Sequence, residues 1–102
     1  MKRNLDAQLL NLADQPFEPA CDLLFVCSSA ALGQLTGDET LSIDRKLALY
    51  NLGKKMRHGG VVDFTAEEIS LLKDRIGRMF PVQLIGRAFE HLETDLADTP
   101  AQ

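Results

Sequence analysis

A helix-start motif and a proline fix the layout of the last third of this chain. The Thr65 hydroxyl can accept a hydrogen bond from the backbone amide of Glu68, while the Glu68 carboxylate accepts one from the amide of Thr65. This capping box predicts a helix from Ala66 to about Phe80. Pro81 then suits the first turn of another helix, because its missing amide hydrogen would have no helical partner there. The pattern therefore predicts two consecutive helices.

Apolar residues recur at helical spacing in both predicted helices. In the first they are Ile69, Leu72, Ile76 and Met79, and in the second Leu84, Ile85, Ala88, Phe89 and Leu92. Asp74 and Arg78 are spaced to form an ion pair on the outer side of the first helix. Gly77 and Gly86 lie inside the two helices, where glycine is unfavourable, so we interpret them as allowing the helices to cross closely.

The N-terminal third contains proline and turn-forming residues. Pro16 and Pro19 forbid a continuous helix and favour extended backbone before them, which predicts a small hairpin. The alternative is a helix over 5–13, since leucines recur there at helical spacing. The segment 21–32 is apolar nearly all round and predicts a central helix with Asp22 in its first turn. Residues 61–64 form an extended link that could pair with the hairpin.

These expectations define the fold class and the domain organisation. The chain has 102 residues, of which 45% are hydrophobic, so it can bury a single core. We expect an α+β, mostly helical fold, with three to four helices and a short N-terminal hairpin or small sheet. Residues 1–93 should form this one domain, and 94–102 an acidic, frayed tail.

The predicted helix over 43–57, with Ser42 as its N-cap, has two apolar stripes instead of one. One stripe consists of Ile43, Leu47 and Tyr50, and the other of Leu49, Leu52 and Met56. A surface helix needs a single buried face. The helix is therefore either wedged between two layers of its own domain, or one stripe meets a partner.

The function expected from this pattern is that of a non-enzymatic protein-interaction module, a homodimer or other homo-oligomer. Leu49, Leu52 and Met56 would make the apolar contact, surrounded by the basic residues Arg45, Lys54 and Lys55. On this hypothesis, Leu52→Asp should break the dimer and leave a folded monomer.

The alternative is a regulator that contacts nucleic acid through the basic segment 45–58, with Lys54, Lys55 and Arg57 as the contact residues. The net charge of −4 argues against general binding to polyanions. A helix-turn-helix reader is disfavoured too, because Glu90 and Glu93 on the last helix would be repelled by phosphates.

Residues with catalytic or metal-binding chemistry are few. Cys21 and Cys27 are expected to be reduced thiols, and neither His58 nor His91 has a ligand-type residue three or four positions away. A nucleophile formed by Cys27 and a histidine would need the fold to bring them together. We therefore expect no enzyme, no cofactor and no metal. The chain lacks an apolar run of about 18 residues, so we expect no membrane span and a cytoplasmic location.

Three segments of the chain also support a resemblance. They are Leu41-Ser-x-Asp-Arg-Lys-Leu-Ala-Leu-Tyr, Val62-Asp-Phe-Thr-Ala-Glu-Glu-Ile-x-Leu-Leu-Lys-Asp-Arg-Ile-Gly and Phe80-Pro-Val-x-Leu-Ile-Gly-Arg-Ala-Phe-Glu-x-Leu-Glu. In this order the chain resembles small phage- or prophage-encoded proteins of similar length, over most of its residues. The resemblance implies an accessory role, with another phage or host protein as an alternative partner. Such proteins have no assigned activity, so no site residues can be transferred.

Overall fold

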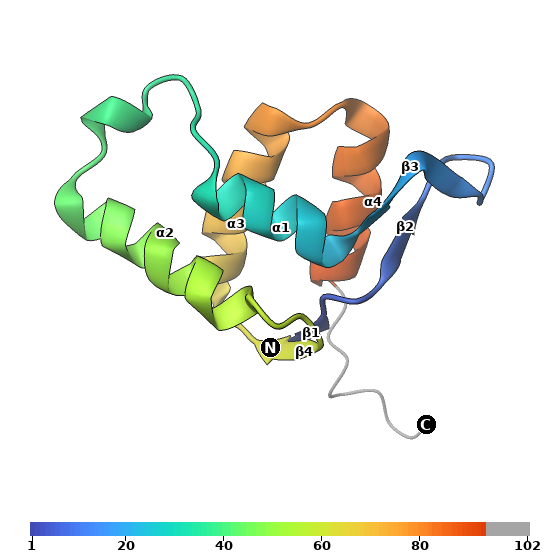
Figure 1. Cartoon of the computed structure of the whole chain (residues 1–102), viewed down its shortest axis with the longest axis horizontal. Helices are drawn as coiled ribbons and strands as arrows, with labels where there is room; N and C mark the ends of the chain where they lie inside the picture. The colour runs from blue at the N-terminus through green and yellow to red at the C-terminus, as the bar shows by residue number, and fades with distance from the viewer. Residues whose placement is uncertain (94–102) are drawn as a thin grey trace.

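The computed structural model describes residues 1–93, which form four α-helices, a short 3₁₀ helix and two small antiparallel sheets. In chain order the elements are β1 (Lys2–Asn4), β2 (Gln8–Leu10), β3 (Pro16–Asp22), α1 (Leu23–Leu32), η1 (Asp38–Thr40), α2 (Ile43–Met56), β4 (Val61–Asp63), α3 (Ala66–Met79) and α4 (Val82–Glu93). Figure 1 shows α1 across the middle of the molecule, α2 to its left and the β2–β3 hairpin to its right. The predicted fold class, α+β and mostly helical, is confirmed. The predicted tail, 94–102, lies outside the described residues.

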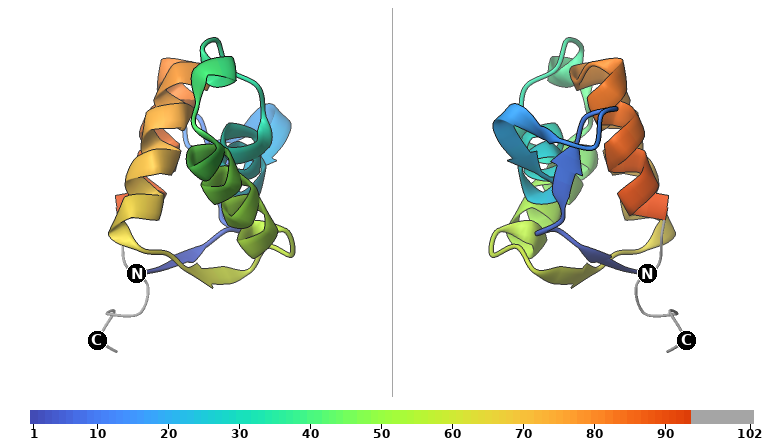
Figure 2. Two further views of the ribbon diagram at one scale, coloured as in Figure 1. Left: turned by 90° about the vertical axis from the view of Figure 1, so that its left-hand side faces the viewer. Right: turned by 90° about the vertical axis from the view of Figure 1, so that its right-hand side faces the viewer.

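The capping box and the proline break are both present in the α3–α4 pair. The Glu68 amide donates to Thr65 Oγ1 at 3.1 Å, and the Thr65 amide donates to Glu68 Oε1 at 2.9 Å. Helix α4 begins directly after Pro81 and packs back against α3 (Figure 2). The interpretation of Gly77 and Gly86 was wrong, since a Cβ atom at either position would meet nothing within 4 Å. Both glycines lie on exposed sides of their helices.

The N-terminal hairpin is confirmed, and the alternative helix over 5–13 is wrong. Strands β2 and β3 pair antiparallel, with an irregularity after Leu9 that widens the hairpin. The Asn11 side chain accepts hydrogen bonds from the amides of Ala13 and Gln15, at 2.8 and 3.2 Å. Asp14 adopts the left-handed conformation, with φ of 61°. These local hydrogen bonds favour a turn over a continuous helix.

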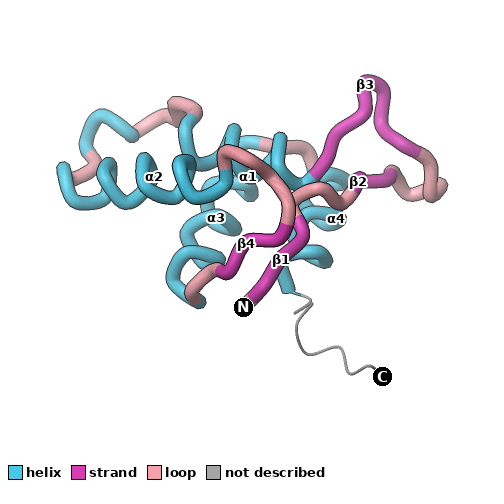
Figure 3. The backbone as a smooth tube through the Cα atoms, turned by 60° about the horizontal axis from the view of Figure 1, so that its bottom comes forward, coloured by secondary structure: helices cyan, strands magenta, loops and turns pink. Residues whose placement is uncertain are grey.

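A second ribbon joins the start of the chain to the segment before α3. Strand β4 pairs antiparallel with β1, with Arg3 opposite Val62 (Figure 3). We had expected this segment to be able to pair with the hairpin, but β2 and β3 form a separate sheet. Arg3 is buried, and its Nε donates to the carbonyl of Leu92 near the end of α4. This contact ties the ribbon to the last helix.

Helix α1 is the central element of the core. It contacts α2, α3 and α4, and most of its surface is covered. Asp22 acts as its N-cap, because its side chain accepts a hydrogen bond from the amide of Phe25 at 2.8 Å. The helix begins two residues later than predicted, since Cys21 and Asp22 still belong to β3. The hydrophobic core to which α1 contributes also contains Leu5, Leu9, Leu52, Met56, Phe64, Leu72, Ile76, Ala88 and Leu92.

Candidate functional site

Helix α2 forms one side of the molecule and is fixed by signals at both of its ends. The Ser42 hydroxyl accepts a hydrogen bond from the amide of Arg45 at 3.1 Å, as expected for an N-cap. The chain leaves the helix through Gly59 and Gly60, which have φ of 69° and 74°. Such positive φ values are strained for residues with a side chain. The two ends of α2 are therefore well defined by the sequence.

The stripe predicted to contact a partner faces the core instead. Leu49, Leu52 and Met56 are 6%, 2% and 0% exposed in the single chain. The prediction that they form the apolar contact of a dimer was wrong. Their role is to hold α2 against α1, and Leu52→Asp would place a charge inside the core of the monomer.

Gly53 is the sequence signal that distinguishes the two stripes. Gly53 follows Leu49 by four residues, so the two lie on the same side of α2 at about 100° of rotation per residue. A Cβ atom at Gly53 would lie 2.6 Å from Cδ2 of Leu32, so the Leu32 side chain of α1 fills the space beside Gly53. The absence of a side chain at this position thus marks the face that α2 packs against its own domain.

The other stripe of α2 remains uncovered. Ile43, Leu47 and Tyr50 are 74%, 53% and 56% exposed, although all three are large and apolar or aromatic. They follow one another at i, i+4 and i+7, and the Lys54 ammonium lies 5.4 Å from the centre of the Tyr50 ring. We call Ile43, Leu47 and Tyr50 the outer stripe.

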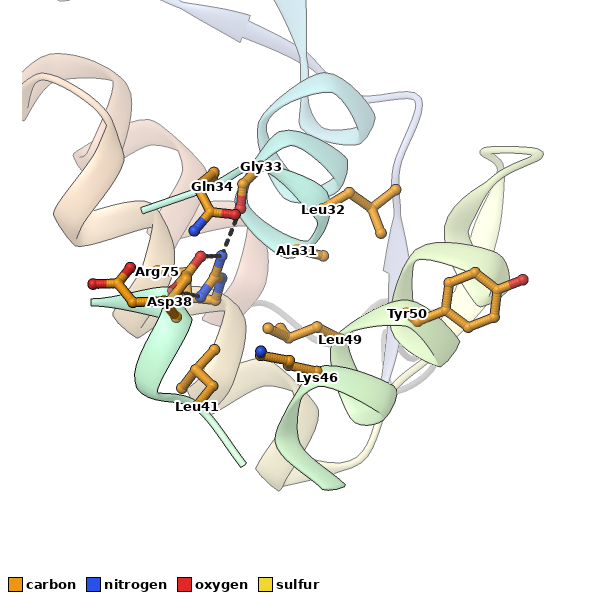
Figure 4. Close-up of a pocket in the computed structure, with 11 residues that line it drawn as sticks. Ala31, Leu32, Gly33, Gln34, Asp38, Leu41, Lys46, Leu49, Tyr50 and Arg75 are labelled. Atoms are coloured by element: carbon orange, nitrogen blue, oxygen red, sulfur yellow. Dashed lines mark hydrogen bonds and ion pairs between the residues drawn. The ribbon is translucent and has the colours of Figure 1, made fainter. Parts of the chain in front are cut away.

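A cavity of about 430 Å³ separates α2 from the end of α1 and the loop that follows it. Lys46 and Leu49 extend into it from α2, whereas Tyr50 points away from it (Figure 4). Leu32, on the opposite wall, is also more than half exposed. Leu32 and Tyr50 both contribute atoms to the lining of this cavity.

A buried ion pair forms the far wall of this cavity. Arg75 donates to Asp38 through Nη1 and Nη2, both at 2.9 Å, and to the carbonyls of Ala30 and Gly33 at the end of α1. The hydrogen bonds from Arg75, with one from the amide of Leu35, lower the pKa of Asp38 to about 2. All three guanidinium nitrogens of Arg75 are thus bonded to protein oxygens.

This ion pair is a structural clamp that the sequence reasoning missed. It caps the carbonyl end of α1 and holds the loop before α2 against α3. One signal could have revealed it: Arg75 occupies the position between Leu72 and Ile76 on the buried side of α3. An arginine at a core position needs an anionic or carbonyl partner.

The basic residues of α2 do not form a single positive surface. Lys55 pairs with Glu68 at 2.8 Å and lies over the Phe64 ring. Burial raises the pKa of Glu68, but hydrogen bonds from Lys55 and the Thr65 amide outweigh this effect and lower it. The Arg57 side chain donates to the His58 ring at 3.1 Å.

The remaining basic side chains have different surroundings. Arg45 faces α3, where it lines two cavities of about 490 and 530 Å³ together with Glu67. Lys54 lies at the end of the outer stripe. Lys54, Lys55 and Arg57 thus have three different partners within the chain, namely the Tyr50 ring, the Glu68 carboxylate and the His58 ring. Contact with a nucleic acid through these three residues stays a prediction.

The two cysteines considered as reactive groups have different surroundings. Burial raises the pKa of the Cys27 thiol to about 12, so it is protonated at neutral pH and a poor nucleophile. Cys21 is half-buried in β3. Within residues 1–93 no group of three or more His, Cys, Asp or Glu side chains is placed to hold a metal ion. The helices of this part of the chain include none with the length and apolar character needed to cross a bilayer.

The chain matches no protein-family model, no curated protein and no solved structure. Its function must therefore be inferred from its own residues.

Proposed function

We propose that this chain is a non-enzymatic protein-interaction module that self-associates through the outer stripe of α2. The observation that carries the proposal is the exposure of Ile43, Leu47 and Tyr50, three large side chains at regular spacing on one helix face. Soluble proteins seldom leave several large apolar side chains exposed together on one face. Such patches are commonly functional.

The outer stripe is not needed for the fold, which strengthens its assignment to binding. Helix α2 is already fixed by its N-cap, by its buried stripe and by the contact of Gly53 with Leu32. Helix α2 would form equally well with polar residues at positions 43, 47 and 50. Three apolar residues at these positions therefore favour a partner that covers them.

A role as a phage or prophage accessory protein in the cytoplasm is proposed on the sequence resemblance alone. A phage or host protein is the alternative occupant of the same surface.

The test compares two substitutions that both place a charge on an exposed apolar residue. Leu47→Asp changes the centre of the outer stripe, and Val82→Asp changes a residue of α4 that is 84% exposed. Sedimentation equilibrium over a range of concentrations should give a dimer mass for the unmodified chain and Val82→Asp, and a monomer mass for Leu47→Asp. Circular dichroism should show the same helix content in all three.

Two results would contradict the proposal. One is a monomer mass for the unmodified chain up to millimolar concentration. The other is an equal loss of association in Leu47→Asp and Val82→Asp, which would indicate a general effect of charge instead of a contact at α2.

A further inference from the structure

The cavity between α2 and the end of α1 contains a cation that its own chain leaves unpaired. Lys46 extends into this cavity from α2 (Figure 4). Within residues 1–93, the Lys46 ammonium forms no ion pair and no hydrogen bond. Lys55 on the same helix differs in this respect, because it is bonded to Glu68 at 2.8 Å. The Lys46 ammonium is therefore free to bind an anionic group that enters the cavity.

The other charged groups of the cavity wall do not neutralise Lys46. Asp38 accepts hydrogen bonds from Arg75 at 2.9 Å on both of its carboxylate oxygens, and one oxygen also accepts from the Leu35 amide at 2.8 Å. Arg75 and Asp38 thus cancel each other's charge. Glu39 is exposed and directly follows Asp38 in η1, where successive side chains point about 120° apart. Because Asp38 faces Arg75, Glu39 faces a different direction.

The rest of the lining is largely apolar. Ala31 and Leu49 are 3% and 6% exposed, Leu41 is half-buried, and Leu32 is exposed. Gln34 adds an amide group. Apolar walls with a few polar groups are typical of small-molecule sites. The volume of about 430 Å³ also lies in the range of such sites, roughly 300–1,000 Å³.

The walls of the cavity are fixed before any ligand binds. Arg75 donates to the carbonyl of Gly33 at 2.8 Å and to Asp38, so it holds the end of α1 and the loop after it in place. On the other side, the Ser42 cap and the buried Leu49 fix α2. A preformed cavity loses little conformational entropy on binding, which favours even a small ligand.

From the unpaired ammonium beside apolar side chains in a preformed cavity, we infer that this cavity binds a small amphipathic anion, namely a carboxylate with a short apolar chain. The carboxylate pairs with Lys46, and the apolar chain covers Ala31, Leu41 and Leu49. A cationic ligand would be repelled by Lys46, and a neutral one would leave the ammonium unpaired. The inference does not rest on the proposed function, because these contacts lie outside the outer stripe.

Three probes that share one alkyl chain test the charge of the ligand: octanoate, octan-1-ol and octylammonium. Their binding is followed by ¹H–¹⁵N nuclear magnetic resonance of the full chain. Octanoate should shift the amide signals of Gly33, Gln34 and Leu49 in a saturable manner, since these residues line the cavity. The dissociation constants of octan-1-ol and octylammonium should be at least about fivefold higher, because neither can pair with the ammonium.

Substitutions at lysine then test the residue that selects the anion. Lys46→Gln should weaken octanoate binding about fivefold at low ionic strength and leave octan-1-ol binding unchanged, because only the ion pair is lost. Lys54→Gln is the matched control, since it removes the same charge from the same helix outside the cavity lining. It should leave both dissociation constants unchanged. Glu39→Gln removes the remaining acidic group of the lining and should not weaken octanoate binding.

Four results would overturn the inference. They are the absence of saturable shifts at millimolar octanoate, octylammonium binding as tightly as octanoate, an equal effect of Lys46→Gln and Lys54→Gln, and binding that Leu47→Ala abolishes. The last result would place the probe on the outer stripe. None of them bears on self-association, which is measured by sedimentation without any probe, so the two proposals can fail separately.

Discussion

Leu47→Ala gives a quantitative test of the outer stripe, because the exposed part of this side chain is known. Complete burial of a leucine side chain is worth about 1.5–3 kcal/mol. Leu47 is 53% exposed in the monomer, so a partner can still cover about half of it. Covering that half contributes about 1 kcal/mol per copy, and about 2 kcal/mol for the two copies of a symmetric dimer. The dissociation constant should therefore rise roughly 30-fold.

Analytical ultracentrifugation with absorbance detection can measure this change for the unmodified chain and Leu47→Ala. Val82→Ala is the control, since it also truncates an exposed apolar residue but lies on α4. It should shift the dissociation constant less than twofold. A change for Leu47→Ala no larger than that of Val82→Ala would refute the assignment of the outer stripe as the contact surface.

Four further substitutions or measurements test the monomer itself. Leu52→Ala should lower the free energy of unfolding by about 2–5 kcal/mol, as measured in urea at a concentration where the chain is monomeric, because Leu52 is buried; a loss below 1 kcal/mol would show that this stripe is not in the core. Gly77→Ala should raise the same quantity by about 0.5–1 kcal/mol, since the new methyl group meets nothing and alanine favours a helix; destabilisation would mean that the position is crowded. Burial raises the pKa of the Cys27 thiol to about 12. This thiol should therefore react with a thiol reagent no faster than the protein unfolds, which peptide mass spectrometry can determine. Hydrogen bonds from Arg75 lower the pKa of Asp38 to about 2 from its ordinary 3.8, so its ionised form stabilises the fold above pH about 4 and this contribution is lost as the pH falls toward 2. Asp38→Asn should accordingly lower the urea midpoint at pH 6 and flatten its decline between pH 4 and pH 2; a decline as steep as that of the unmodified chain would contradict this.

Helix boundaries were the most predictable part of the fold, because short-range chemistry determines them. Ser42 and Thr65 each form the predicted cap with an amide three residues later. Pro81 separates α3 from α4 without any long-range contact being required. Signals of this kind depend only on neighbouring residues, so they can be recognised in a single sequence.

Contacts between distant segments were less predictable. The pairing of Arg3 with Val62 joins residues far apart in the chain, and three-residue strands have too short a pattern to indicate a partner. The choice between the two stripes of α2 likewise depended on where α1 lies. Both stripes have helical spacing, and the exposure of their side chains in the folded chain shows which one is covered. The three apolar residues predicted to contact a partner therefore lie on the face of α2 that is buried in its own domain.

The Arg75–Asp38 clamp has a consequence for binding at a surface that it does not touch. It fastens the loop directly before Ser42, so the first turn of α2, with Ile43, has its position set in the free chain. A surface that is already ordered loses little conformational entropy when it docks. Releasing the clamp should therefore weaken association through slower productive encounters, with every side chain of the contact surface left in place.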